Sequence, residues 1–225
     1  MTEAEWLACT DPQKMLEFLR GKASERKLRL FACACCFRLT ELWGILVEDE
    51  LAAVEFANLY ADGGATREDL KLARDDLSNI DDYYGSSEEI RFHALDCVTA
   101  IPLGDVNGLA NRIIEYFEND HYWTEAELEA EQEAERVLQC DILRDFFGKP
   151  FRPVAVEPSW LTWNDGTVPR LAQAIYDEGA FDRLPVLADA LEETGCTNPD
   201  ILGHCRGPGP HVRGCWVVDL LLGKK

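Results

Sequence analysis

The amino-acid sequence predicts an all-α protein. Apolar residues recur at three- and four-residue spacing through most of the chain, as they do on the buried face of a helix. Residues that cap helix N-termini (Ser, Thr, Asp and Asn) stand before these periodic segments. No stretch shows the sustained alternation of apolar and polar residues that is typical of a half-buried strand. We therefore expect a helical bundle or array with a smaller helical module at the C-terminal end.

The first two expected helices have clear start signals. Asp11 can cap a helix whose first position is taken by Pro12, and Gly21 ends that helix. Ser24 caps a longer helix. Its apolar stripe consists of Leu28, Phe31, Cys35, Leu39, Leu42 and Leu46.

Four more helices are expected before residue 120. A segment spanning about 48–61 ends at a pair of glycines. Thr66 opens the next helix, with Asp69 three residues later as its capping-box partner. The segments 86–101 and 106–117 each carry a further apolar stripe, so both are interpreted as helices.

The longest expected helix runs from Thr124 to about Phe147 and ends at Gly148. The composition changes at this point, and we place a domain boundary there. Residues 1–147 are interpreted as an acidic helical domain, and residues 148–225 as a connector rich in Pro and Trp followed by a small helical module.

The C-terminal region is expected to be helical after its connector. Three prolines within 148–167 argue against regular structure there, while its aromatic residues are too apolar for a free linker. Short helices are then expected at about 168–178, 182–193 and 198–206. A last helix is expected to begin at Pro210 and to span 210–222, with a strand as the alternative.

Acidic residues dominate the middle of the chain. The whole chain has 42 acidic and 22 basic residues, a formal net charge of −20, and residues 39–147 hold 27 of the acidic and 7 of the basic residues. Such a surface repels nucleic acid and attracts basic proteins, so we expect a basic protein partner and no nucleic acid. The alternative is a solvated surface without a partner. The strongest candidates for partner binding are Glu125, Glu127, Glu129, Glu131 and Glu133.

The nine cysteines and the N-terminal sequence favour a reducing compartment. An odd number of cysteines does not suit a secreted disulfide framework. Glu3 and Glu5 stand where an export signal would carry basic residues, and no apolar segment follows. Asp219 interrupts the most apolar stretch, which is therefore too short for the ~20 residues that span a membrane. We expect a cytoplasmic protein with reduced thiols and no membrane segment.

Residues that can bind a metal ion gather near the C-terminus. A helix that begins at Pro210 would bring two of them, His211 and Cys215, to one face. Zinc is usually held by four nitrogen and sulfur ligands of this kind. The spacing matches no zinc motif, however, and the alternative is that the cysteines are small buried residues. The candidate zinc ligands are Cys196, His204, Cys205, His211 and Cys215.

No catalytic motif is evident, so we expect a protein that is not an enzyme. The leading interpretation is a non-catalytic intracellular interaction module with an acidic surface suited to a basic protein. A structural zinc site in the C-terminal Cys/His cluster is the first alternative. An inhibitor or immunity-type protein that covers a basic toxin or enzyme is the second. A hydrolase that uses His93 or His211 is the enzymatic alternative.

Two blocks of the sequence resemble a known bacterial family. The opening "MTEAEWLACTDPQKMLEFLRGKASERKLRLFACACC" and the segment "YADGGATREDL" resemble the start of a set of bacterial proteins that occur as many paralogues in a genome. The closing "HCRGPGPHVRGCWVVDLLLGK" resembles the end of the same set. The resemblance covers roughly residues 1–74 and 141–225 and implies no particular activity, cofactor or catalytic residue. It suits a scaffold that presents a varied recognition surface.

Overall fold

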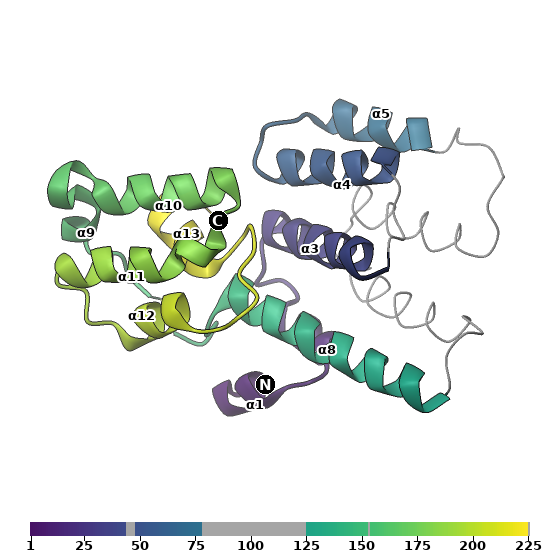
Figure 1. Cartoon of the computed structure of the whole chain (residues 1–225), viewed down its shortest axis with the longest axis horizontal. Coiled ribbons are helices and arrows are strands. Elements are labelled where there is room, and N and C mark those ends of the chain that lie inside the picture. The colour runs from purple at the N-terminus through teal and green to yellow at the C-terminus, as the bar shows by residue number, and fades with distance from the viewer. Residues whose placement is uncertain (44–47, 78–124, 153, 225) are drawn as a thin grey trace. The chain divides into compact units, whose positions relative to one another are not determined.

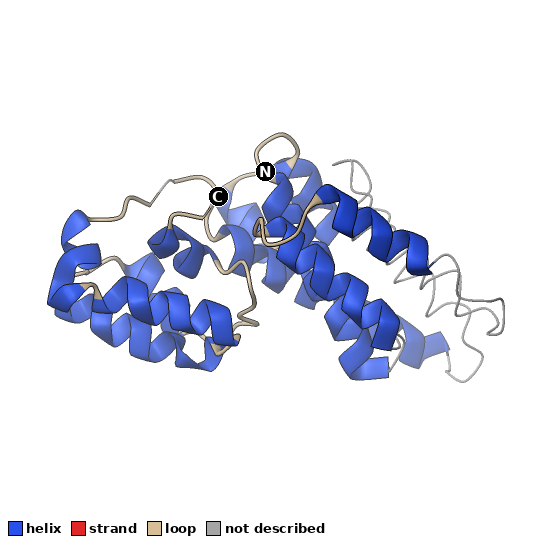
Figure 2. Ribbon diagram, turned by 90° about the horizontal axis from the view of Figure 1, so that it is seen from above, coloured by secondary structure: helices blue, strands red, loops and turns tan. Residues whose placement is uncertain are grey.

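The computed structural model describes residues 1–43, 48–77, 125–152 and 154–224 (Figure 1). Every regular element in these ranges is a helix, as Figure 2 shows, and the predicted all-α fold class is confirmed. The helices expected at 86–101 and 106–117 lie outside the described residues. Among the helices that are described, none has both the length and the apolar character that crossing a membrane requires.

The contacts divide the chain into two units. The terminal unit combines residues 1–8 with residues 141–225, and the central unit consists of residues 9–140. The long helix α8 (Glu125–Phe147) contributes its last turns to the terminal unit. The domain boundary that the composition suggests after residue 147 stays a prediction.

The described residues of the central unit form four helices besides the first part of α8. They are α2 (Pro12–Leu19), α3 (Glu25–Trp43), α4 (Glu48–Ala61) and α5 (Arg67–Leu77), of which α3 packs on α4 and α4 on α5. The expected caps are present. The Asp11 carboxylate accepts hydrogen bonds from the backbone N–H groups of Gln13 and Lys14. The backbone N–H of Thr66 donates to Asp69 at 2.8 Å, and that of Asp69 donates to the Thr66 hydroxyl at 3.2 Å.

In the terminal unit, four helices surround one apolar core. These helices are α10 (Thr167–Glu178), α11 (Leu184–Glu193), α12 (Pro199–Arg206) and α13 (Trp216–Leu222), and Figure 1 shows them lying together. Asn198 caps α12 by accepting from the backbone N–H groups of Asp200 and Ile201, with Pro199 at the first helical position. The core contains Val168, Ala172, Ile175, Leu184, Leu187, Leu191, Ile201, Val217 and Val218.

A short helix at the start of the chain, α1 (Glu3–Ala8), completes the terminal unit. Its Trp6 is fully buried and donates its indole N–H to the carbonyl oxygen of Gly148 at 2.9 Å. The Arg144 guanidinium in turn donates to the carbonyl oxygen of Trp6. These bonds attach the first residues of the chain to the end of α8. Helix α1 is not among the expected helices, because six residues are too few for a periodic pattern.

Two expectations for the C-terminal region are wrong. The connector 148–167 is not wholly irregular, because it contains α9 (Pro158–Thr162) and a 3₁₀ turn. Pro158 occupies a first-turn position of α9, where a missing N–H costs nothing. The last helix begins at Trp216 and not at Pro210, so the segment 207–215 is a loop. The alternative of a strand for the last segment is wrong as well, since α13 is helical.

Candidate metal centre

Four side chains of the terminal unit converge where α8 ends. Asp145 lies in the last turn of α8 and His204 in the last turn of α12. His211 lies in the loop 207–215, and Cys215 ends this loop at the N-cap position of α13. Each residue contributes one possible ligand atom, and the four atoms lie within 4.8 Å of one another. We call these four residues the metal centre.

The glycine at position 214 brings the loop against the end of α8. Gly214 has a φ of +106°, a conformation that other residues rarely adopt. A Cβ atom at this position would lie 2.3 Å from the Phe146 ring, so only a glycine allows the backbone to pass so close. Phe146 is the residue after Asp145. The close approach therefore holds the loop next to the carboxylate of the metal centre.

Three distances within the centre are slightly shorter than the edges of a zinc coordination shell. The Asp145 Oδ1 atom lies 2.8 Å from Nδ1 of His211 and 3.1 Å from Nε2 of His204. The same Nε2 atom lies 3.2 Å from Sγ of Cys215. Zinc bonds of 2.0–2.3 Å in a tetrahedron separate neighbouring ligand atoms by about 3.3–3.6 Å. Small outward shifts of the side chains would thus accommodate an ion.

Two of the four residues, Asp145 and His211, also make hydrogen bonds with backbone groups outside the centre. The second carboxylate oxygen of Asp145, Oδ2, accepts a hydrogen bond from the backbone N–H of Val212 at 3.0 Å. The second ring nitrogen of His211, Nε2, lies 3.3 Å from the carbonyl oxygen of Gly207, to which it can donate. These contacts leave Oδ1 and Nδ1 to face the centre. Such outer contacts orient ligands in metal sites and select the histidine tautomer.

The charges within the centre depend on burial and on these contacts. Burial by itself would raise the pKa of Asp145, but hydrogen bonds from His204 and His211 outweigh it, and the pKa lies below its ordinary value. Burial would lower the pKa of His211, but the Asp145 carboxylate reverses the direction and raises it. Burial, with the nearby Asp145 charge, raises the pKa of Cys215 well above its ordinary value. Without an ion, Cys215 is therefore a neutral thiol at neutral pH.

The arrangement differs from that of a nucleophilic cysteine with its base. In a Cys–His–Asp triad the histidine uses one ring nitrogen for the cysteine and the other for the carboxylate. Here a single nitrogen, Nε2 of His204, contacts both Cys215 and Asp145. Cys215 is also fully buried. All four possible ligand atoms lie within 4.8 Å of one another, as the ligands of a single ion do.

Three of the five residues that the sequence singled out lie in this centre, namely His204, His211 and Cys215. Cys196 and Cys205 lie outside this group and are buried in the apolar core of the terminal unit, to which Cys215 also belongs. Burial raises the pKa of Cys205 to about 12, as suits a core thiol. His211 and Cys215 are brought together by the loop 207–215 and do not share a helix face, because α13 begins only after Cys215.

Sequence reasoning missed Asp145. It is 3% exposed in a stretch of α8 whose neighbours Ile142, Leu143 and Phe146 are buried core residues. An acidic residue within such an apolar stretch is a detectable signal, since a buried charge requires partners. Its partners lie far along the chain, however, and their identity does not follow from spacing.

Among the described residues, the cysteines of the central unit belong to no comparable group of possible metal ligands. Cys33, Cys35 and Cys36 are buried on α3, as expected for core residues, and no cysteine that the structure describes takes part in a disulfide. Burial raises the pKa of Cys33 to about 12. His93 lies outside the described residues.

The predicted partner-binding residues all belong to α8. Glu133 is exposed and lies 3.4 Å from the Arg136 guanidinium. The side chains of the other four lie outside the described part of the molecule; they are Glu125, Glu127, Glu129 and Glu131. Their role stays a prediction.

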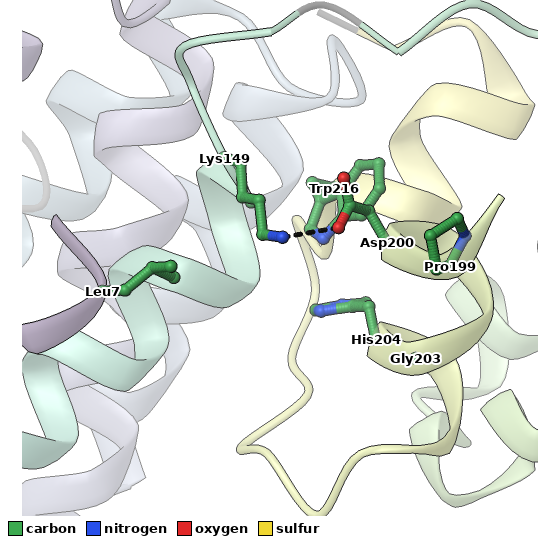
Figure 3. Close-up of a pocket in the computed structure, with 8 residues that line it drawn as sticks. Leu7, Lys149, Pro199, Asp200, Gly203, His204 and Trp216 are labelled. Atoms are coloured by element: carbon green, nitrogen blue, oxygen red, sulfur yellow. Dashed lines mark hydrogen bonds and ion pairs between the residues drawn. The ribbon is translucent and has the colours of Figure 1, made fainter. Parts of the chain in front are cut away.

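A pocket of about 260 Å³ adjoins the metal centre (Figure 3). Its wall includes His204, Asp200 and Gly203 from α12, Trp216 from α13 and Lys149 from the segment after α8. Lys149 and Asp200 form an ion pair of 2.5 Å at this wall. His204 is thus shared by the pocket and the metal centre.

Comparison of the chain with protein-family models, with curated proteins and with solved structures returned no match. The resemblance to a paralogue-rich bacterial family therefore stays a prediction.

Proposed function

We propose that the terminal unit binds one zinc ion through Asp145, His204, His211 and Cys215, and that this ion has a structural role. The observation that carries the proposal is the convergence of four ligand atoms of suitable chemistry within 4.8 Å. They come from α8, α12 and the loop 207–215, three segments that the fold brings together.

The choice of zinc follows from the ligand types. Magnesium and calcium prefer shells made only of oxygen atoms, whereas this centre offers two nitrogens, one sulfur and one carboxylate oxygen. Zinc takes Cys, His and carboxylate ligands in a four-coordinate tetrahedron. The observed separations of 2.8–3.2 Å are close to the edges of such a shell.

A structural role is supported by the number and burial of the ligands. Catalytic zinc sites use three protein ligands and leave the fourth position for water or substrate. Here four protein ligands are available, and Asp145 and Cys215 are almost completely buried. A bound ion would tie the end of α8 to the loop and to α12. We therefore expect it to stabilise the terminal unit.

The first experiment is a metal analysis of the untagged, reduced protein, with thermal unfolding in the presence and absence of a strong chelator. We expect about one zinc per chain and a lower Tm with chelator. Cys215→Ser should abolish zinc binding. Cys205→Ser is the matched control, because Cys205 is equally buried but lies outside the set of ligands. A metal-free protein that takes up no added zinc, with an unchanged melt, would overturn the proposal.

A non-catalytic interaction with a basic protein is the second candidate function, and an inhibitor or immunity-type role is its more specific form. It is supported by the excess of acidic residues between 39 and 147 and by the exposure of Glu133. An interaction of this kind weakens as salt rises, because ~1 M salt shortens the range of surface charges to about 3 Å. A complex that persists unchanged in ~1 M salt would contradict it.

A further inference from the structure

Among the residues that the structure describes, Nδ1 of His204, the ring nitrogen that faces away from the metal centre, has no outer hydrogen-bond partner. The inference drawn from it rests on the proposed zinc site. Asp145 and His211 each have an outer hydrogen bond, to Val212 and Gly207 respectively. Within the described part of the chain, His204 makes its polar contacts through Nε2, and its ring packs against the rings of His211 and Trp216. No hydrogen bond to its Nδ1 is found among these residues. A histidine that binds a metal almost always donates its other N–H to a carboxylate, a carbonyl or water.

Asp200 is a suitable acceptor on the same face of α12. It precedes His204 by four residues on α12, so the two side chains leave successive turns in the same direction. Figure 3 shows both of them pointing into the pocket next to Lys149. Oδ1 of Asp200 is paired with Lys149, while the other carboxylate oxygen makes no hydrogen bond within the described residues.

We propose that Asp200 is a positioning residue for the metal centre. Its carboxylate accepts the Nδ1–H of His204 when the ion is bound, either directly after a side-chain rotation or through a water molecule in the pocket. The pocket of about 260 Å³ has room for both arrangements. The bond holds the proton on Nδ1 and keeps Nε2 free for the metal. Lys149 competes with His204 for the same carboxylate.

Two variants distinguish this role from a merely structural ion pair. Asp200→Asn and Lys149→Met both break the pair between these side chains. If Asp200 positions His204, Asp200→Asn lowers zinc affinity about tenfold, the lower end of the effect of losing an outer partner. Lys149→Met leaves the affinity unchanged or raises it. Equal losses in the two variants, or no loss in Asp200→Asn, would overturn the proposal.

Asp200 also lies in the first turn of α12, where a negative charge stabilises the helix whether or not metal is present. Unfolding of each variant is therefore measured both with zinc and with chelator, and only the difference is assigned to the metal. Asp200→Glu should recover part of the affinity. The Nδ1–H proton of His204 should exchange with solvent faster in Asp200→Asn than in the parent, and equal exchange rates would contradict the proposal.

A parent protein that binds no zinc would instead refute the proposed function itself. The two failures are thus distinguishable, because the positioning role is tested only by comparison among variants of a zinc-binding protein.

Discussion

Buried cysteines have different surroundings in the two units. In the central unit, Cys33 lies on α3 within an apolar core, and its thiol contacts the carbonyl oxygen of Val54 at 3.7 Å. In the terminal unit, Cys215 is equally buried, but its sulfur lies 3.2 Å from a histidine nitrogen in a group that includes Asp145. Burial raises the pKa of both thiols. Burial is therefore common to both cysteines, and what distinguishes Cys215 is the group of possible ligand atoms from separate segments around it.

The largest loss of stability is expected on replacing Gly214, which lets the loop 207–215 approach the end of α8. Gly214→Ala would place a Cβ atom 2.3 Å from the Phe146 ring and would strain a backbone with φ of +106°. We expect a loss of about 3 kcal/mol in unfolding free energy from overpacking and backbone strain, and a loss of zinc binding. Denaturant unfolding and metal analysis measure the two effects.

The matched control is Gly195→Ala. Gly195 has a φ of +90°, but a Cβ atom there would have no neighbour within 4 Å. Only the backbone strain remains, for which we expect about 1 kcal/mol and no loss of zinc. Equal losses in the two variants would show that contact with Phe146 does not hold the loop.

The comparison between the two buried thiols can be tested directly. Cys215→Ser should remove the stabilisation by zinc, which amounts to about 2.7 kcal/mol when free zinc is a hundred times its Kd. Cys33→Ser should lose about 1–3 kcal/mol from its buried hydroxyl but keep the full effect of zinc. Chemical unfolding with zinc and with chelator separates the two. If chelator still lowered the stability of Cys215→Ser as much as that of the parent, the cysteine would not be a ligand.

The pH dependence of zinc binding follows from the raised pKa of Cys215. The thiol is protonated between pH 6 and 8, and it must lose its proton to bind the ion. Zinc affinity should therefore rise with pH, about tenfold or 1.4 kcal/mol per pH unit for each proton released. Because the pKa of His211 is raised, this side chain is also protonated at acidic pH and must lose a proton to bind the ion. Zinc affinity should therefore depend more steeply on pH in the acidic range. Competition titrations with a chelating dye measure this, and an affinity independent of pH would exclude Cys215 as a thiolate ligand.

The smallest expected effect is a gain in stability, in contrast to the losses predicted above. Gly203 lies within α12 on the wall of the pocket, and a Cβ atom there would meet nothing within 4 Å. Gly203→Ala should stabilise the protein by about 0.5–1 kcal/mol, because alanine loses less conformational freedom in a helix. Thermal unfolding measures the gain. A loss of stability would show that the pocket wall has less room than the structure indicates.

Much of the fold could be predicted because its signals are local. The hydrogen bonds that start α2 and α12 join residues only two or three positions apart, and the capping box of Thr66 and Asp69 is equally short in range. The start of the last helix was predicted wrongly at Pro210. That residue suits a first helical position, but the contacts of His211 and Val212 with Asp145 and the φ of Gly214 keep the segment out of a helix.

By itself, the sequence determined that this protein is all-α, where most of its described helices lie, and that His204, His211 and Cys215 are candidate ligands. These conclusions depend on caps, periodicity and residue type, which act over a few residues. Only the tertiary structure decided that Asp145 joins these three and that Cys196 and Cys205 do not. The physical reason is that a site of this kind needs ligand atoms within a few ångströms, and packing of distant segments, not sequence spacing, sets those distances.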